Sequence, residues 1–217
     1  MIGVSVDGDG PPKDPWGIMN SDGTSPWAAK SGQSVDSVRR QVVDAAGELM
    51  RATTGSASSG AAQGSDSSGQ SAMTLYLALL TDRLPVYART MINLQDQVGE
   101  GTVERNLLPV AQATIQFYCE ILAAKVSVFT KPDQLLQLRR VLKSNNLGPH
   151  SAHVRVAAYL DREREQGRVA ADVDCDASAR LLIGACVNYA FTKMLLDDVE
   201  PSEVFVDQVV RGLRIAP

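Results

Sequence analysis

Few side chains in this sequence have the types and spacing that catalysis or metal binding requires. His150 and His153 are three residues apart near an expected helix start, where two imidazoles could share one metal ion. No cysteine, third histidine or His-Glu-x-x-His pattern accompanies them, so we predict no metal site. The sequence also lacks a P-loop, a Gly-x-Gly-x-x-Gly fingerprint, a Gly-x-Ser-x-Gly elbow and a plausible triad. We therefore predict no catalytic residue and no cofactor.

The three cysteines show neither paired nor Cys-x-x-Cys spacing, which favours a reducing cytoplasm over a disulfide scaffold. Cys119 lies among apolar residues of an expected helix and is predicted to be an inert buried thiol. Cys175 stands between Asp174 and Asp176. We expect it to be exposed, with a thiolate disfavoured by the two carboxylates.

Two uncharged polar residues interrupt an apolar helix. Gln112 and Gln116 lie one turn apart in the helix expected to begin at Thr102. Such a group either satisfies its hydrogen bonds locally in the core or contacts a ligand.

The composition indicates a soluble protein without the charge of a nucleic-acid binder. The chain of 217 residues suffices for one or two domains, and its hydrophobic share of 44% can supply a core. The net charge is −4 and the sequence pI is about 5.2. The start, MIGVSVDGDGPPKD, lacks the basic and apolar runs of a signal peptide. We expect a cytoplasmic protein.

The N-terminal third is poor in apolar residues. Residues 1–33 are rich in Gly, Pro, Ser and Asp and are predicted to be a disordered tail. Trp16 and Trp27 are its only large side chains, and one of them could instead dock on the body or on a partner.

A first helix is expected from Ser34 or Asp36 to about Thr53, where apolar residues recur at helical spacing. Residues 54–72 contain no Val, Leu, Ile, Phe, Lys or Arg. That stretch cannot bury enough apolar area to offset its ordering entropy, so we predict a flexible linker.

The rest of the chain has helical periodicity between Gly and Pro stops, with no convincing strand. Pro85 is expected to kink or break one helix, Pro109 to bend the next, and Gly167 to end another. The expected helices begin at Met73, Thr102, Pro132, Ser151, Ala177 and Pro201. The predicted fold class is all-α.

The helix expected over 177–196 is apolar on nearly every face, which indicates burial or contact with another subunit. Asp174 and Asp176 precede it as caps. Arg180, Asn188 and Lys193 make it a poor membrane span.

Several motifs together resemble the TetR-type bacterial transcriptional regulators from roughly Val38 to the C-terminus. They are GRVAADVDCDASARLLIGACV, DRLPVYARTM, VGEGTVERNLLPVAQATIQFY and PSEVFVDQVVRGL. The resemblance implies a TetR-like helical bundle over 77–217, with a ligand pocket and C-terminal dimerisation helices.

The DNA-binding unit that the resemblance implies is degenerate over 34–76. QVVDAAGELM is similar to the family's first helix, and GQSAMTLY has the frame that ends its recognition helix. Between them, the Ser/Gly/Ala run replaces the residues that a helix-turn-helix must bury. Residues 1–72 carry five basic and eight acidic side chains, the wrong balance for contacting phosphates. We therefore predict that this chain has lost sequence-specific DNA binding of its own.

The resemblance also implies where ligand and partner bind. The pocket would lie between the helix after Met73, the helix from Thr102 and the two that follow. The candidate ligand-binding residues are Gln112, Gln116, Tyr87, Tyr118, Asn188 and Tyr189. The candidate dimer-interface residues are Leu181, Gly184, Ala185, Asn188, Phe205 and Val209.

These features predict a homodimeric regulator-class protein that binds a small hydrophobic molecule. It could act as a sensor, as a sequestering protein, or as a modulator that forms mixed dimers with a complete regulator. One alternative is a repurposed enzyme that acts on a hydrophobic metabolite in the same pocket. A second alternative is an intact ligand-responsive repressor in which the Ser/Gly run is an insertion.

Overall fold

The computed structural model describes residues 36–37, 40, 43–44, 47, 66–129, 132, 135–136, 138–140, 150–196 and 198–217. The predicted tail with Trp16 and Trp27 lies outside the described residues, as do residues 54–65 of the predicted linker. The described residues of the first expected helix and of the helix expected from Pro132 are helical.

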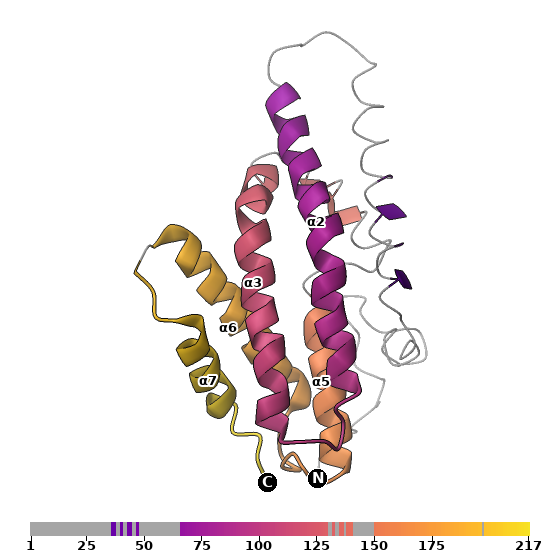
Figure 1. Cartoon of the computed structure of the whole chain (residues 1–217), viewed down its shortest axis with the longest axis vertical. Helices are drawn as coiled ribbons and strands as arrows, with labels where there is room; N and C mark the ends of the chain where they lie inside the picture. Colours follow the sequence, from indigo (N-terminus) through magenta and orange to yellow (C-terminus); the bar gives the residue numbers. More distant parts are fainter. Residues whose placement is uncertain are drawn as a thin grey trace, which may run out of the picture. The chain divides into compact units, whose positions relative to one another are not determined.

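The described part of the chain consists of helices joined by short turns, and it contains no strand, so the all-α prediction is confirmed. Figure 1 labels five helices, which are α2 (Asp66–Gln95), α3 (Val103–Phe129), α5 (His150–Glu165), α6 (Cys175–Leu195) and α7 (Ser202–Gly212). None of the helices in this part is long and apolar enough to cross a membrane.

α3 is the helix around which the others pack. It contacts α2, α6 and α7, while α5 contacts α2 and α6 (Figure 1). Its inward residues Leu107, Val110 and Ala111 are almost fully buried. Burial of these apolar side chains is the main force that holds the helices together.

α6 buries only one of its faces. Ala179, Leu182 and Cys186 are inaccessible to solvent, whereas Leu181 is 66% exposed. The sequence predicted that this helix is buried or shared with another subunit. In the single chain one face of the helix is buried, and another, apolar face is exposed.

The helix ends follow the capping signals in the sequence. The Thr102 hydroxyl accepts the backbone N–H of Arg105 at the start of α3. The Asp174 carboxylate accepts the N–H of Ala177 at the start of α6, as predicted. Both caps satisfy donors that a helix start leaves unpaired.

Gly167 ends α5 in the left-handed region at φ 71°, which confirms the predicted stop. Gly99 in the α2–α3 turn has φ 86°, and a Cβ there would lie 3.0 Å from Gln166 Oε1. Gly99 therefore serves the left-handed backbone of the turn, since the nearby atom is the end of an exposed, flexible side chain that can move.

One expectation about the extent of the helices was wrong in the described residues. Residues 66–72, predicted as linker, belong to α2. Extending a helix that already exists costs far less than nucleating a new one, so the polar residues can continue the helix that the apolar run after Met73 supports. The break that was expected at Pro85 as an alternative to a kink does not occur, because the residues on both sides of Pro85 are helical.

A buried ion pair joins the α2–α3 turn to the α5–α6 turn. Glu163 is inaccessible to solvent, and its Oε2 lies 2.6 Å from Arg168 Nε. Its Oε1 accepts the N–H of Gly99 at 3.2 Å. The Arg168 guanidinium also donates to the carbonyls of Gly99, Glu100 and Gly101, at 2.6, 2.9 and 2.8 Å. One guanidinium thus pairs with the nearby Glu163 carboxylate and also binds three carbonyls of a turn that lies about 68 residues away in sequence.

Asn106 extends this network to α5. Its side-chain amide donates to the carbonyl of Glu100 at 2.8 Å and to the Tyr159 hydroxyl at 2.9 Å. Burial raises the pKa of Tyr159, so its hydroxyl stays neutral. The turn therefore contacts α3 through the Asn106 amide and α5 through the Glu163 carboxylate.

The ion pair generates a stability prediction. Arg168→Ala leaves the Glu163 carboxylate buried without its charge partner, a change that costs about 3–5 kcal/mol in the free energy of unfolding. Urea denaturation followed by far-UV circular dichroism measures it. The control is Arg162→Ala, which removes an exposed arginine from α5, the helix that carries Glu163, and should change stability by less than about 0.5 kcal/mol. Equal stability of the two variants would contradict the structural role of the pair.

Candidate ligand-binding site

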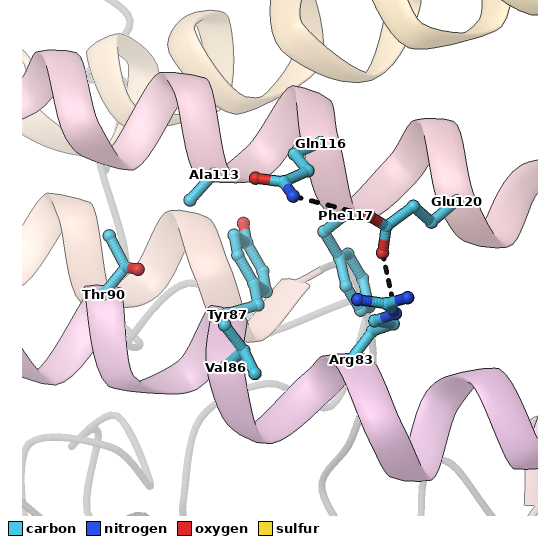
Figure 2. A pocket seen from close by; sticks show the side chains of 8 residues that line it. All are labelled: Arg83, Val86, Tyr87, Thr90, Ala113, Gln116, Phe117 and Glu120. Atoms are coloured by element: carbon cyan, nitrogen blue, oxygen red, sulfur yellow. Dashed lines mark hydrogen bonds and ion pairs between the residues drawn. The ribbon is translucent and has the colours of Figure 1, made fainter.

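A groove between α2 and α3 is the candidate site, and it is built from two matching stripes. α2 supplies Arg83, Val86, Tyr87 and Thr90, and α3 supplies Ala113, Gln116, Phe117 and Glu120 (Figure 2). In each set the residues follow the spacing i, i+3, i+4, i+7, which places them on one helix face. Because the helices run antiparallel, Arg83 meets Glu120 at one end, and Thr90 lies nearer Ala113 at the other.

The floor of the groove is aromatic. Tyr87 and Phe117 are both buried, and their rings stack with centroids 4.7 Å apart and an interplanar angle of 6°. The Tyr87 hydroxyl lies 3.0 Å from Thr114 Oγ1. Since Thr114 donates its own proton to the carbonyl of Val110, Tyr87 is the donor in this pair.

The rim at one end carries charge. Arg83 Nε lies 3.0 Å from Glu120 Oε2 and 3.1 Å from Asp82 Oδ2. The Gln116 amide donates to Glu120 Oε1 at 3.4 Å, so a chain of polar contacts crosses from α2 to α3 (Figure 2). The side chains of Arg83 and Glu120 are 45% and 29% exposed, so solvent screens their attraction.

The groove is small and open on one side. Its cavity volume is about 120 Å³. Val86, on its edge, is 67% exposed. Burial raises the pKa of Tyr87 above its ordinary value, so this phenol is a hydrogen-bond donor and not a proton acceptor at neutral pH. The arrangement suits binding better than acid–base chemistry.

The structure brings two of the six predicted ligand-binding residues together. Tyr87 and Gln116 line the groove. Gln112, one turn before Gln116, instead donates to Ser202 Oγ at 3.4 Å and ties α3 to the start of α7. Tyr118 lies in the core, with Phe117 edge-on at 5.3 Å.

The other two predicted ligand-binding residues lie on α6. Asn188 is exposed. Tyr189 is buried, donates its hydroxyl to the carbonyl of Glu200 and packs on Phe205 with ring centroids 4.6 Å apart. Neither lines the groove.

The sequence-based selection did not include six residues that line the groove, namely Arg83, Val86, Thr90, Ala113, Phe117 and Glu120. The signal was present as the shared spacing on two antiparallel helices. A search for polar residues within apolar runs does not detect this spacing, because most residues that line the groove are apolar or belong to an ion pair.

The predicted dimer-interface residues lie on α6 and α7. Leu181, Gly184 and Asn188 on α6 are exposed, and Ala185 is partly buried. Phe205 and Val209 on α7 are also partly buried. Leu181, Gly184 and Asn188 are therefore the accessible part of this set, whereas Phe205 and Val209 pack against the core.

The cysteines have the environment of structural thiols. Cys186 is fully buried, and burial raises its pKa to about 12. Cys175, expected to be exposed, is buried, and its Sγ lies 3.8 Å from the carbonyl of Val173. Burial first and then the Asp161 carboxyl raise its pKa to about 11. Among the residues that the structure places, no three His, Cys, Asp or Glu side chains form a group that could hold a metal ion.

One comparison with known proteins found a relationship. Residues 122–213 match the family model of the AefR-like transcriptional repressor, C-terminal domain. The match covers the end of α3 together with α5, α6 and α7, and it begins just beyond Glu120, the last residue of the groove. The chain matches no curated protein and no solved structure at a significant level.

The buried thiols predict slow alkylation and a loss of stability at alkaline pH. At pH 8, iodoacetamide should label Cys186 and Cys175 far more slowly in the folded protein than in urea, because the thiolate is the nucleophile. Their folded pKa values lie above the unfolded value of about 8.5. Stability is therefore unaffected below about pH 8.5 and falls as the pH rises from there toward 11–12.

Peptide mass spectrometry measures the labelling, and urea denaturation at pH 7 and pH 10 measures the stability. Partly exposed Cys119 serves as the internal reference for reagent access. Labelling of Cys186 at the same rate in folded and unfolded protein would contradict its burial.

Proposed function

We propose that this protein is of the transcriptional-regulator class, senses a small hydrophobic molecule and no longer reads DNA by itself. The regulator class is supported by the match of residues 122–213 to the family model of the AefR-like transcriptional repressor, C-terminal domain. The observation that carries the ligand-binding part is the α2–α3 groove, with its stacked aromatic floor and polar rim. Ligand pockets are mostly apolar and carry a few placed polar groups, and this groove has that composition on a small scale.

The course of α2 supports the loss of DNA binding. The frame GQSAMTLY, which in the family ends the recognition helix, lies here inside a continuous helix from Asp66 to Gln95. A helix-turn-helix needs the recognition helix to end, so that it can pack across its partner helix and enter the major groove. The excess of acidic residues in 1–72 supports the same conclusion, because phosphates must be neutralised by Lys, Arg and helix N-termini.

An apolar stripe on α6 supports a homodimer. Its positions alternate in steps of four and three residues, which is the spacing of a coiled-coil seam. They are Ala177, Leu181, Gly184, Asn188, Phe191 and Leu195, and all are exposed in the single chain. An isologous contact along the two-fold axis would bury this stripe in both copies at once.

A dimer of this kind suggests the biological role. A chain that keeps the dimer face and the ligand groove but lacks a DNA-reading unit can sequester the ligand. It can also pair with a complete regulator, and the mixed dimer would then hold one DNA-reading unit in place of two. Half the phosphate and base contacts are lost in such a dimer, so its operator affinity falls steeply.

The loss of DNA binding predicts the result of an electrophoretic shift. The purified protein should not retard the promoter region of its own gene at about 150 mM salt beyond the weak retardation of random DNA. Adding it to a complete TetR-type regulator from the same host should reduce that regulator's specific shift. Tight, salt-sensitive and sequence-specific binding by this chain alone would refute the proposal and favour an intact repressor.

The dimer face predicts the effect of a larger residue at Gly184. A Cβ at Gly184 meets no atom within 4 Å in the single chain, so Gly184→Leu should leave α6 folded and helical. In a dimer, the added side chain would separate the two copies of α6. We expect the variant to elute as a folded monomer of 23.2 kDa in size exclusion with light scattering, whereas the wild type elutes as a dimer.

The matched control is Ala158→Leu, which adds a comparable side chain at an exposed position of α5 and should stay dimeric. A fully dimeric Gly184→Leu protein with normal helicity would show that the two copies meet elsewhere.

A further inference from the structure

We propose that the α2–α3 groove selects a neutral molecule of one aromatic ring that carries a hydrogen-bond donor, as a phenol does. This inference rests on the ligand-sensing function proposed above and specifies the chemistry of the ligand.

The size and floor of the groove set the first requirement. A cavity of about 120 Å³ is close to the roughly 150 Å³ of an apolar protein cavity that holds benzene. One ring therefore fits inside the groove, whereas a second ring would extend beyond its open side. The buried Tyr87 and Phe117 rings favour an aromatic ligand, since aromatic pairs attract one another beyond the area they bury.

Gln116 sets the second requirement. Its amide group contacts the Glu120 carboxylate, which can only accept a hydrogen bond, so the NH₂ must face Glu120. The carbonyl oxygen is then directed away from Glu120, toward Ala113 and the floor of the groove, as Figure 2 shows. A ligand that donates a hydrogen bond meets an acceptor there.

Thr90 adds an adaptable group at the other end. Thr81 and Thr114 each donate to the carbonyl four residues earlier, at 2.8 and 2.7 Å. For Thr90 the structure shows no such bond to any residue it describes, so its hydroxyl remains able to donate or accept. The groove thus offers one acceptor and one hydroxyl.

The charges on the rim set the third requirement. Arg83 is paired with two carboxylates, those of Asp82 and Glu120, so the three side chains carry a net negative charge. An anionic ligand is repelled, because the guanidinium that would attract it is already neutralised. A cation could pair with Glu120 only by displacing Arg83, and solvent screens its attraction to the exposed carboxylate of Asp82. A neutral ligand avoids both costs.

The test titrates four ring compounds into the protein and follows the backbone amide signals of α2 and α3 by NMR. Phenol should bind at least about ten-fold more tightly than benzoate, and more tightly than protonated benzylamine or toluene. Gln116→Leu removes the acceptor while keeping an exposed side chain of similar size. It should weaken phenol binding about ten-fold and leave toluene binding unchanged.

The control is Gln166→Leu, an exposed glutamine at the end of α5 that does not line the groove, and it should leave phenol binding unchanged. Benzoate binding as tightly as phenol would overturn the inference. So would a phenol affinity that Gln116→Leu does not alter, or no phenol binding up to its solubility limit.

A separate measurement distinguishes failure of this inference from failure of the proposed function. Native mass spectrometry of the protein from its own host, as wild type and as Phe117→Ala, detects a metabolite held in the groove. If the wild type retains a metabolite that the variant loses, and phenol gives no response, the inferred ligand class is wrong but the ligand-sensing function stands. No retained metabolite and no response to any of the four probes overturns both.

Discussion

One buried ion pair joins the α2–α3 turn to α5 and to the start of the α5–α6 turn. Glu163 is a carboxylate without access to solvent, and such a group is tolerated only when charge and hydrogen bonds surround it. Arg168 supplies the charge, and the Gly99 N–H supplies a hydrogen bond. The same guanidinium donates hydrogen bonds to carbonyls of the α2–α3 turn. The partners of one carboxylate therefore hold the turn between α2 and α3 against the segment that leads from α5 into α6.

The ion pair and the groove lie at different places along α2 and α3, and their physical character differs. The turn end is charged, and its carboxylate, that of Glu163, is inaccessible to solvent. At the groove, Gln116 and Val86 are exposed, and the polar contacts on the rim are solvent-screened. The solvent-screened contacts on the rim can therefore be exchanged for contacts with a ligand at lower cost than the contacts of the buried ion pair.

The sequence predicted the helices better than it predicted the site. Caps such as Thr102 and Asp174 and stops such as Gly167 act locally, so their residue types alone reveal them. The Glu163–Arg168 pair could not be foreseen, because DREREQGR reads as a solvated helix end until the fold brings the turn of Gly99 against it. Gln112 and Tyr189 were plausible ligand contacts in sequence, but distant partners, Ser202 and the carbonyl of Glu200, account for their polar atoms. A pattern within one helix does not reveal which groups are satisfied by another.

The unbroken course of α2 has a consequence for how the chain can vary. The helix passes from Asp66 through Tyr76 to the groove residues Arg83 and Thr90 without interruption. Each α-helical residue adds about 1.5 Å of rise and about 100° of rotation. A single inserted or deleted residue between Tyr76 and Arg83 would therefore turn everything upstream by more than a quarter of a circle relative to the groove. The length of this segment is constrained as strictly as its composition, even at positions where no side chain contacts anything.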